Sequence, residues 1–222
     1  MAFGMKYFIV GNGDYAKMMS RYLKNTSGIE ILGFTVEKNI ISEKTIDGFR
    51  VISDEDLANN FNVSECRLMM GIGYRNMNKI KENEFKRYKS LGFSFDNYIH
   101  PTAIIEKNVV LGEANNIFEG VIIQEGVSIG DANLIYAGAL ISHESNIGNY
   151  NSLSVKSCVA GCCTIGNNCF LGANSTVRDN IRVADYTLLG AGAYLDKDTK
   201  EYDVVASQKP VLLEGKSSLE FI

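Results

Sequence analysis

The chain of 222 residues is poor in several residue types, and these shortages exclude whole classes of protein. It has no Trp, two Pro and two His, and its 22 Lys and Arg are outnumbered by 26 Asp and Glu. Nucleic-acid-binding domains carry a basic surface, so the net charge of −4 argues against a nucleic-acid partner. Apolar and charged shares of 45% and 22% are ordinary for a globular protein and exclude a disordered or collagen-like chain.

Long apolar runs are missing as well. A membrane-spanning helix needs about 20 consecutive apolar residues, and the runs from Tyr7 to Val10 and from Arg67 to Gly73 are far shorter. The N-terminus has no apolar region or cleavage site of a signal peptide. The five cysteines form no C-x-x-C pair. We therefore expect a cytoplasmic protein with no membrane association and no metal site, whose reduced thiols fill core space.

The most informative feature is a repeat of six residues. From Ile105 to Leu195, every sixth residue is Ile, Leu or Val, at sixteen positions without exception. The residue two before each of them is usually small or short, as at Ser145 and Cys163, and the next residue is often Gly. A strand repeats every two residues and a helix every 3.6, so neither explains a period of six. Stacked coils explain it, and we predict a parallel β-helix over residues 101–198 with a tail over 199–222.

The first hundred residues follow a different pattern. The apolar run Lys6 to Val10 leads into the motif G-x-G-x-x-A at residues 11–16 and then into a helical pattern that ends at Leu23. Further strands are predicted at 29–36, around Val51 and at 68–72, with helices near 54–60 and 77–89. This alternation predicts an α/β, Rossmann-like βαβαβ domain over residues 1–100.

The glycine-rich turn suits more than one ligand. A pyrophosphate would lie on the helix N-terminus at Gly11, Gly13 and Asp14, and the nucleoside would contact Glu37 and Lys38 at the end of the second strand. NAD is one alternative, and a turn that binds nothing is another. NAD enzymes use two such halves, whereas the rest of this chain is a β-helix. We therefore favour a nucleotide-linked sugar.

The two units together resemble a known family. An α/β unit joined through Ile99-His100-Pro101 to hexapeptide repeats is similar to the bacterial left-handed β-helix acyltransferases of sugar biosynthesis. This group contains sialic-acid O-acetyltransferases and bacillosamine-type nucleotide-amino-sugar N-acetyltransferases. The most specific blocks are residues 140–148 and 159–174. The resemblance implies a left-handed coil, a homotrimer, and acetyl-CoA or another short acyl-CoA as the acyl donor.

The resemblance also implies an active site. The family's His–Glu pair falls on His143 and Glu144, and its backbone contacts to pantetheine fall at Gly161, Ala173 and Ala191. The chemistry agrees, because imidazole ordinarily titrates near pH 6.5 and can accept a proton at neutral pH, while a carboxylate can orient it.

Three further positions bear on the number of histidines in the expected active site. Tyr15 and Ser152 stand where some family members carry an additional His. His100, which precedes Pro101, is expected to pack at the first coil.

The expected activity is transfer of an acyl group, acetyl in the simplest case, from acyl-CoA to the amino group of a nucleotide-linked amino sugar in bacterial surface-glycan (lipopolysaccharide) biosynthesis. His143 would be the general base and Glu144 its orienter. One alternative is O-acetylation of sialic acid or a related sugar. Another is a non-catalytic β-helix scaffold that binds a nucleotide.

Overall fold

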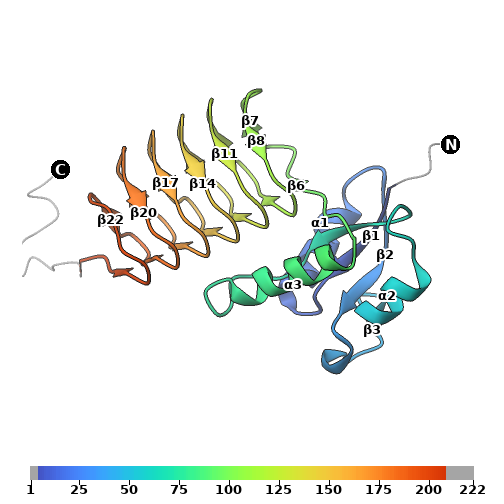
Figure 1. Ribbon diagram of the computed structural model, residues 1–222. Helices are drawn as coiled ribbons and strands as arrows, with labels where there is room; N and C mark the ends of the chain where they lie inside the picture. Colours follow the sequence, from blue (N-terminus) through green and yellow to red (C-terminus); the bar gives the residue numbers. More distant parts are fainter. Residues whose placement is uncertain (1–4, 209–222) are drawn as a thin grey trace, which may run out of the picture.

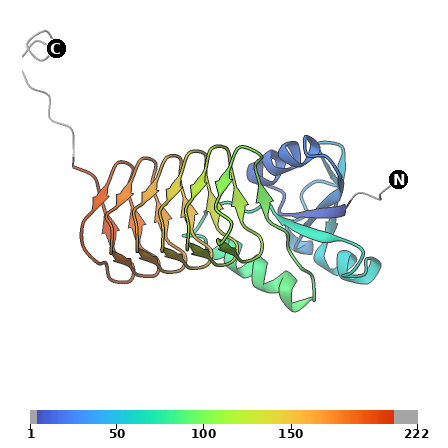
Figure 2. The same ribbon diagram turned by 90° about the horizontal axis from the view of Figure 1, so that it is seen from above.

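The computed structural model describes residues 5–208, which form an α/β unit at one end of a stack of β-coils. In Figures 1 and 2 the α/β unit lies beside the first coils, and its last helix runs along the side of the stack. No helix in the described part of the chain is long and apolar enough to cross a bilayer.

The α/β unit is built on a sheet with the strand order β3-β4-β2-β1-β5. The strand β1 pairs in parallel with β2 and β5, β2 pairs in parallel with β4, and only β3 is antiparallel to its neighbour. The elements are β1 (Met5–Val10), α1 (Asp14–Lys24), β2 (Ile29–Val36), the 3₁₀ helix η1 (Lys38–Ile40), β3 (Thr45–Ile46), β4 (Phe49–Ser53), α2 (Asp54–Asn60), β5 (Arg67–Met70) and α3 (Lys79–Ser90). The strands and helices predicted from the sequence are present close to their expected bounds, whereas η1 and β3 were not predicted.

Both faces of this sheet are covered, which explains why β1 is apolar along its whole buried part. Tyr7 and Ile9 point to the side of α1, while Phe8 and Val10 point to the side of α2 and α3. Strands buried on both faces read as continuous apolar runs rather than alternating ones. Because β1, β2 and β5 run parallel, their carboxyl ends meet at one edge of the sheet.

The coils form three parallel sheets, in which nearly every strand pairs with the strand three further along the chain. Inward Ile, Leu and Val side chains of successive coils stack in register, as in the pairing of Ile141 with Val159. The parallel β-helix is confirmed. Each sheet forms one face of the coil stack, and we call them the covered, the apolar and the polar face.

The covered face consists of β6 (Tyr98–Ile99), β9 (Asn116–Ile117), β12 (Leu134–Ile135), β15 (Ser152–Leu153), β18 (Phe170–Leu171), β21 (Leu188–Leu189) and β23 (Val204–Val205). The apolar face consists of β7 (Ile104–Ile105), β10 (Ile122–Ile123), β13 (Leu140–Ile141), β16 (Cys158–Val159), β19 (Thr176–Val177) and β22 (Tyr194–Leu195). The polar face consists of β8 (Val110–Leu111), β11 (Ser128–Ile129), β14 (Asn146–Ile147), β17 (Thr164–Ile165) and β20 (Arg182–Val183).

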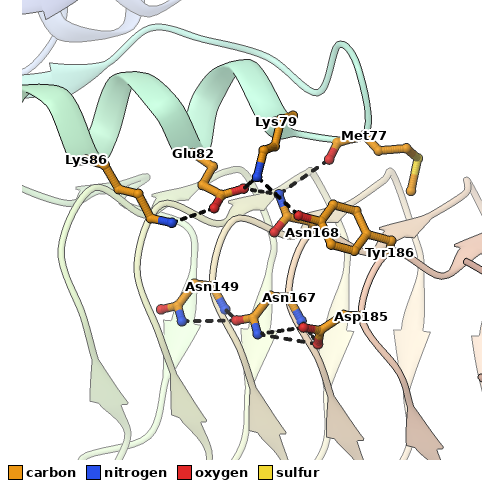
Figure 3. Close-up of polar contacts among 9 residues, drawn as sticks. All are labelled: Met77, Lys79, Glu82, Lys86, Asn149, Asn167, Asn168, Asp185 and Tyr186. Atoms are coloured by element: carbon orange, nitrogen blue, oxygen red, sulfur yellow. Dashed lines mark hydrogen bonds and ion pairs between the residues drawn. The ribbon is translucent and has the colours of Figure 1, made fainter. Parts of the chain in front are cut away.

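The corners between faces are tight and repeat with the same period. Every sixth residue from Ala114 to Gly192 has a positive φ angle, whether it is Gly, Asn or a larger residue such as Glu144. The small residues two positions before the inward ladder are buried at these corners, among them Ser145 and Cys163. Side-chain oxygens replace missing backbone partners there, and Figure 3 shows one such row, in which Asn149 is linked to Asn167 and Asn167 to Asp185.

The covered face takes its name from α1 and α3, which pack on its outward side chains. Asn78, at the start of α3, accepts a hydrogen bond from the Ser152 hydroxyl at 2.6 Å and donates to the carbonyl of Cys169 at 3.1 Å. Glu82 accepts from the Asn168 amide at 3.2 Å, as Figure 3 shows. These polar contacts fix the α/β unit against the coils.

The C-terminal end of the coil stack lies beyond residue 198, where the sequence places the start of a tail. Strand β23 still pairs with β21, through Val204 and Leu188. Residues 209–222 of the predicted tail, including Pro210, lie outside the described residues. The division into three segments stays a prediction.

Candidate functional site

A pocket of about 740 Å³ lies at the carboxyl edge of the α/β sheet, between that sheet, α3 and the coils. Ligands of open α/β sheets bind at this edge, where neighbouring strands lead off to opposite sides. Strands β1 and β5 are such a pair, because the chain leaves β1 for β2 and reaches β5 only after β4. The pocket lining comprises Gly11, Asn12, Gly13, Asp14, Tyr15, Met18, Val36, Ile40, Gly71, Ile72, Gly73, Tyr74, Arg75, Ile80, Glu84 and Tyr136.

The floor of the pocket depends on two glycines at the ends of β1 and β5. Gly11 has φ 111°, and a Cβ built there would lie 2.9 Å from the carbonyl oxygen of Gly71. A Cβ at Gly71 would lie 2.5 Å from the carbonyl oxygen of Val10. The two loops can therefore approach each other only without side chains. The structure thus places the predicted Gly11, Gly13 and Asp14 together in one cavity.

The N-terminus of α1 opens into the same pocket. Gly13 is its N-cap, and no side chain caps the first turn. The first N–H groups of a helix have no partner within the helix and carry the positive end of its dipole. Together with Arg75 on the opposite loop, this end of the pocket suits an anionic group.

Glu37 and Lys38 follow β2 beside the pocket, but the pocket lining passes from Val36 to Ile40 without them. An oxygen of Glu37 lies 3.7 Å from the Arg87 guanidinium, and the Lys38 ammonium lies 3.0 Å from Glu55. Both charges therefore have partners within the chain, and their contact with a nucleoside stays a prediction.

Two tyrosines line the end of the pocket that faces the coils. The Tyr15 hydroxyl accepts a hydrogen bond from the Asn116 amide at 2.9 Å, and its ring contacts the ring of Tyr136 edge-on. Burial raises the pKa of both phenols well above their ordinary value of 10.0. They stay protonated at neutral pH, so they can donate hydrogen bonds to a ligand but do not act as bases.

His143 lies elsewhere, in the corner between β13 on the apolar face and β14 on the polar face. Its backbone N–H donates to the Gln124 side chain at 3.1 Å, and its carbonyl accepts from Cys162 at 2.9 Å. Its imidazole is exposed and lies over Gly161 of the next coil, where a Cβ would stand 2.6 Å from Cε1 and 2.7 Å from Nε2. Only glycine at residue 161 leaves room for the ring in this position.

Glu144 is the next residue in that corner and points the other way. It has φ 55°, and its carboxylate lies over Gly126 of the preceding coil. Among the interactions of the described residues, no hydrogen bond or ion pair joins the side chains of His143 and Glu144. The role of Glu144 as an orienter of the imidazole stays a prediction.

The three predicted contacts to acyl-CoA lie along both edges of the apolar face. Gly161 shares the corner of His143, while Ala173 and Ala191 lie on successive coils at the other edge, which the apolar face shares with the covered face. Within residues 5–208 the Gly161 N–H has no hydrogen-bond partner, although its carbonyl accepts from Asn180 at 3.0 Å. A backbone N–H without a partner is the kind of group that stabilises developing negative charge on an oxygen.

The remaining candidates have structural surroundings. All five cysteines are free, and burial raises the pKa of Cys169 to about 12, which keeps it a thiol. His100 contacts the Thr102 hydroxyl at 2.8 Å and the Tyr22 ring. The described residues contain no group of three His, Cys, Asp or Glu side chains arranged to bind a metal.

Several pocket residues carry no sequence signal of their own. Tyr136 comes from a coil corner, and Arg75 and Glu84 are ordinary charged residues in their segments. Only Gly71 and Gly73, two glycines directly after the observed end of β5 at Met70, resemble the signal that identified Gly11 and Gly13. A search for a second glycine-rich strand end would have found that loop.

Comparison with known proteins supports the repeat and the overall architecture. Residues 162–197 match the family model of the bacterial transferase hexapeptide (six repeats). No curated protein matches the chain in a sequence comparison. The resemblance to hexapeptide-repeat sugar acyltransferases predicted from the sequence is confirmed.

Solved structures similar to most of the chain include PerB, PglB and WeeI. PerB from Caulobacter crescentus, in complex with CoA and GDP-perosamine, is 26% identical, covers 93% of this chain and 95% of its own, and has a TM-score of 0.80. The acetyltransferase domain of PglB from Neisseria gonorrhoeae, with acetyl coenzyme A, is 20% identical, with coverages of 92% and 97% and a TM-score of 0.79. WeeI from Acinetobacter baumannii is 14% identical, with coverages of 91% and 97% and a TM-score of 0.77. The latter two show the shared fold alone.

Proposed function

We propose that the protein transfers an acyl group, acetyl in the simplest case, from acyl-CoA to the amino group of a nucleotide-linked amino sugar. The observation that carries the proposal is the combination of a pocket at the glycine-rich turn of Gly11 and Gly13 with an exposed imidazole over Gly161, whose N–H has no hydrogen-bond partner within residues 5–208. PerB, with the same architecture over nearly its whole length, is a perosamine N-acetyltransferase by name, and its histidine variants were solved with CoA and GDP-perosamine.

In the proposed reaction the sugar amine attacks the thioester carbonyl carbon, and a C–N bond forms. His143 accepts the proton that the nitrogen loses. The Gly161 N–H donates to the carbonyl oxygen while that oxygen carries negative charge. The C–S bond then breaks, and CoA leaves as a thiol after His143 returns the proton. Gly161, Ala173 and Ala191 leave room for the pantetheine arm beside the coil.

The pocket and His143 lie at different edges of the apolar face, with β13 between them. We infer that a second copy of the chain, packed on the apolar face, brings its His143 to the neighbour's pocket. The outward residues of this face are mainly apolar, and Ile122 and Tyr194 are 39% and 60% exposed in the single chain. The homotrimer and the left-handed coil implied by the family belong to this proposal. The place of action would be the cytoplasm, in surface-glycan biosynthesis.

The test of the reaction is release of free CoA thiol from acetyl-CoA in the presence of UDP-, dTDP- and GDP-linked amino sugars. We expect His143→Ala to lower kcat by a factor of about 10² to 10⁴, as for loss of a general base. His100→Ala replaces the chain's other histidine and serves as the matched control, with nearly unchanged kcat.

Three results would contradict the proposal. An unchanged kcat for His143→Ala removes that residue from proton transfer. Activity on free sialic acid but on no nucleotide-linked amino sugar would replace N-acylation by O-acylation. Nucleotide binding without any acyl transfer would favour the alternative function, a non-catalytic β-helix scaffold that binds a nucleotide.

A further inference from the structure

The pocket has two chemically different ends, and their contacts show which part of a nucleotide-linked sugar each would hold. One end is formed by Tyr15 and Tyr136 and touches the coils, so a sugar bound there is nearest to the apolar face. The other end is formed by Val36, Ile40 and Glu84 and lies against β2 and α3. The base of the nucleotide therefore belongs at the second end.

The charges around the second end exclude a phosphate there. The Arg87 guanidinium contacts three carboxylates, with 2.7 Å to Asp54, 3.7 Å to Glu37 and a close contact to Glu84. One positive charge against three negative charges leaves the region negative, which repels a pyrophosphate and attracts hydrogen-bond donors. The pyrophosphate is better placed at the N-terminus of α1 and Arg75.

Glu84 is the carboxylate of this cluster that reaches the cavity. Its side chain is 16% exposed, and its Oε2 contacts Arg87, whereas its Oε1 has no hydrogen-bond partner within residues 5–208. Burial raises the pKa of the Glu84 carboxyl and Arg87 offsets part of that rise, so its charge is incompletely solvated in the free protein. The apolar side chains of Val36, Ile40 and Ile80 line the same end and suit the faces of a planar base.

We propose that the nucleotide is a guanosine diphosphate and that Glu84 recognises the guanine. This inference rests on the proposed function, because it assumes that the pocket holds a nucleotide-linked sugar. Guanine alone among the common bases presents two adjacent N–H donors, N1–H and the 2-amino group, which match the two oxygens of a carboxylate. Uracil and thymine present one N–H between two carbonyl oxygens, which a carboxylate repels. Adenine has no ring N–H on this edge.

The test measures the affinity of the full chain for GDP, IDP, UDP, dTDP and ADP by calorimetry. IDP differs from GDP only by the missing 2-amino group, so it removes one of the two proposed bonds. We expect GDP to bind at least about tenfold more tightly than IDP and than UDP, as for a lost hydrogen bond to a charged group. Glu84→Gln should weaken GDP binding about tenfold or more and abolish the preference over UDP.

The matched control is Glu55→Gln, which removes an exposed carboxylate outside the pocket and should leave GDP binding unchanged. Equal affinities of the wild-type chain for GDP and UDP would overturn the proposal, and this comparison needs no variant. A folded Glu84→Gln chain that keeps its GDP preference would overturn the role of Glu84.

The outcomes separate this inference from the proposed reaction. GDP selectivity that depends on Glu84, without CoA release on any amino sugar, supports the guanine site and contradicts the acyltransferase. CoA release with UDP- or dTDP-linked amino sugars but not with GDP-linked ones supports the acyltransferase and overturns the guanine site.

Discussion

The covered face and the apolar face of the β-helix are built from the same repeat, but only the covered face packs against another part of the described chain. Their inward columns are alike, with Leu153 and Val159 fully buried in the same core. Their outward columns differ. On the covered face, Asn116 and Ser152 make hydrogen bonds to the α/β unit of the same chain. On the apolar face, the outward residues Ile104 and Ile122 have no cover within the described chain.

The difference shows that the two columns of the repeat have separate tasks. The inward column makes the coil, because it supplies the stacked apolar core. The outward column decides what lies against each face. Polar anchors fix a specific neighbour in one orientation, whereas an exposed apolar strip favours association with a second copy. Three substitutions test this separation of tasks: one in the inward column, one on the apolar face and one on the covered face.

The largest effect is expected in the inward column. Ile141→Ala removes a fully buried side chain and should lower the free energy of unfolding by about 2 to 5 kcal/mol, since it leaves a cavity between stacked coils. Urea denaturation followed by circular dichroism measures the change. The control is Asn146→Ala, an exposed outward residue of the polar face, with an expected change within about 0.5 kcal/mol. Equal losses in both variants would refute the separation of the two columns.

An intermediate effect is expected on the apolar face. Ile122→Asp places a charge in the proposed subunit contact, where it would be buried without a partner. The oligomer should dissociate, and CoA release should fall at least about tenfold, while the coil itself stays folded. Sedimentation equilibrium measures the assembly. Ser128→Asp makes the matched change on the polar face and should keep both assembly and activity; a wild-type chain that is already monomeric and active would contradict the proposed contact.

The smallest effect is expected on the covered face at Lys81. This lysine is fully buried and donates to the carbonyl of Asn151 at 3.0 Å, and burial lowers its pKa well below 10.5. The unfolded chain therefore binds more protons at this residue than the folded chain. The buried charge of Lys81 lowers the free energy of unfolding at low pH. This loss becomes smaller as the pH rises from the lowered pKa towards 10.5, by at most about 1.4 kcal/mol per pH unit.

Lys81→Met has no such titration. The stability of the wild type relative to this variant should therefore increase between pH 7 and pH 9.5, as measured by urea midpoints. The difference between the two proteins cancels the tyrosines that titrate in both. A difference that is independent of pH would show that Lys81 is not the buried titrating group of the covered face.

Much of the fold could be predicted because its signals are local. The period of six from Ile105 to Leu195 predicted the coil, and the motif at Gly11 and Gly13 predicted a turn between β1 and α1. The resemblance to the family pointed to His143, and the structure places this residue at a corner between β13 and β14. Glu84, Arg75 and Tyr136 could not be found in this way, because they come together only when α3 and the coils close over the sheet edge.

The scarcity of proline and histidine in the sequence is explained by where these residues are absent or present in the structure. The lack of proline between residues 102 and 209 fits coils whose backbone N–H groups pair with the next coil, and the lack of histidine leaves one exposed imidazole at a corner. The sequence by itself determined the coil, the inward core and the glycine turn, since these depend on residues close together along the chain. Only the tertiary structure decided which face is covered, where the pocket ends and which carboxylate reaches it, because those properties depend on side chains that distant segments bring into contact.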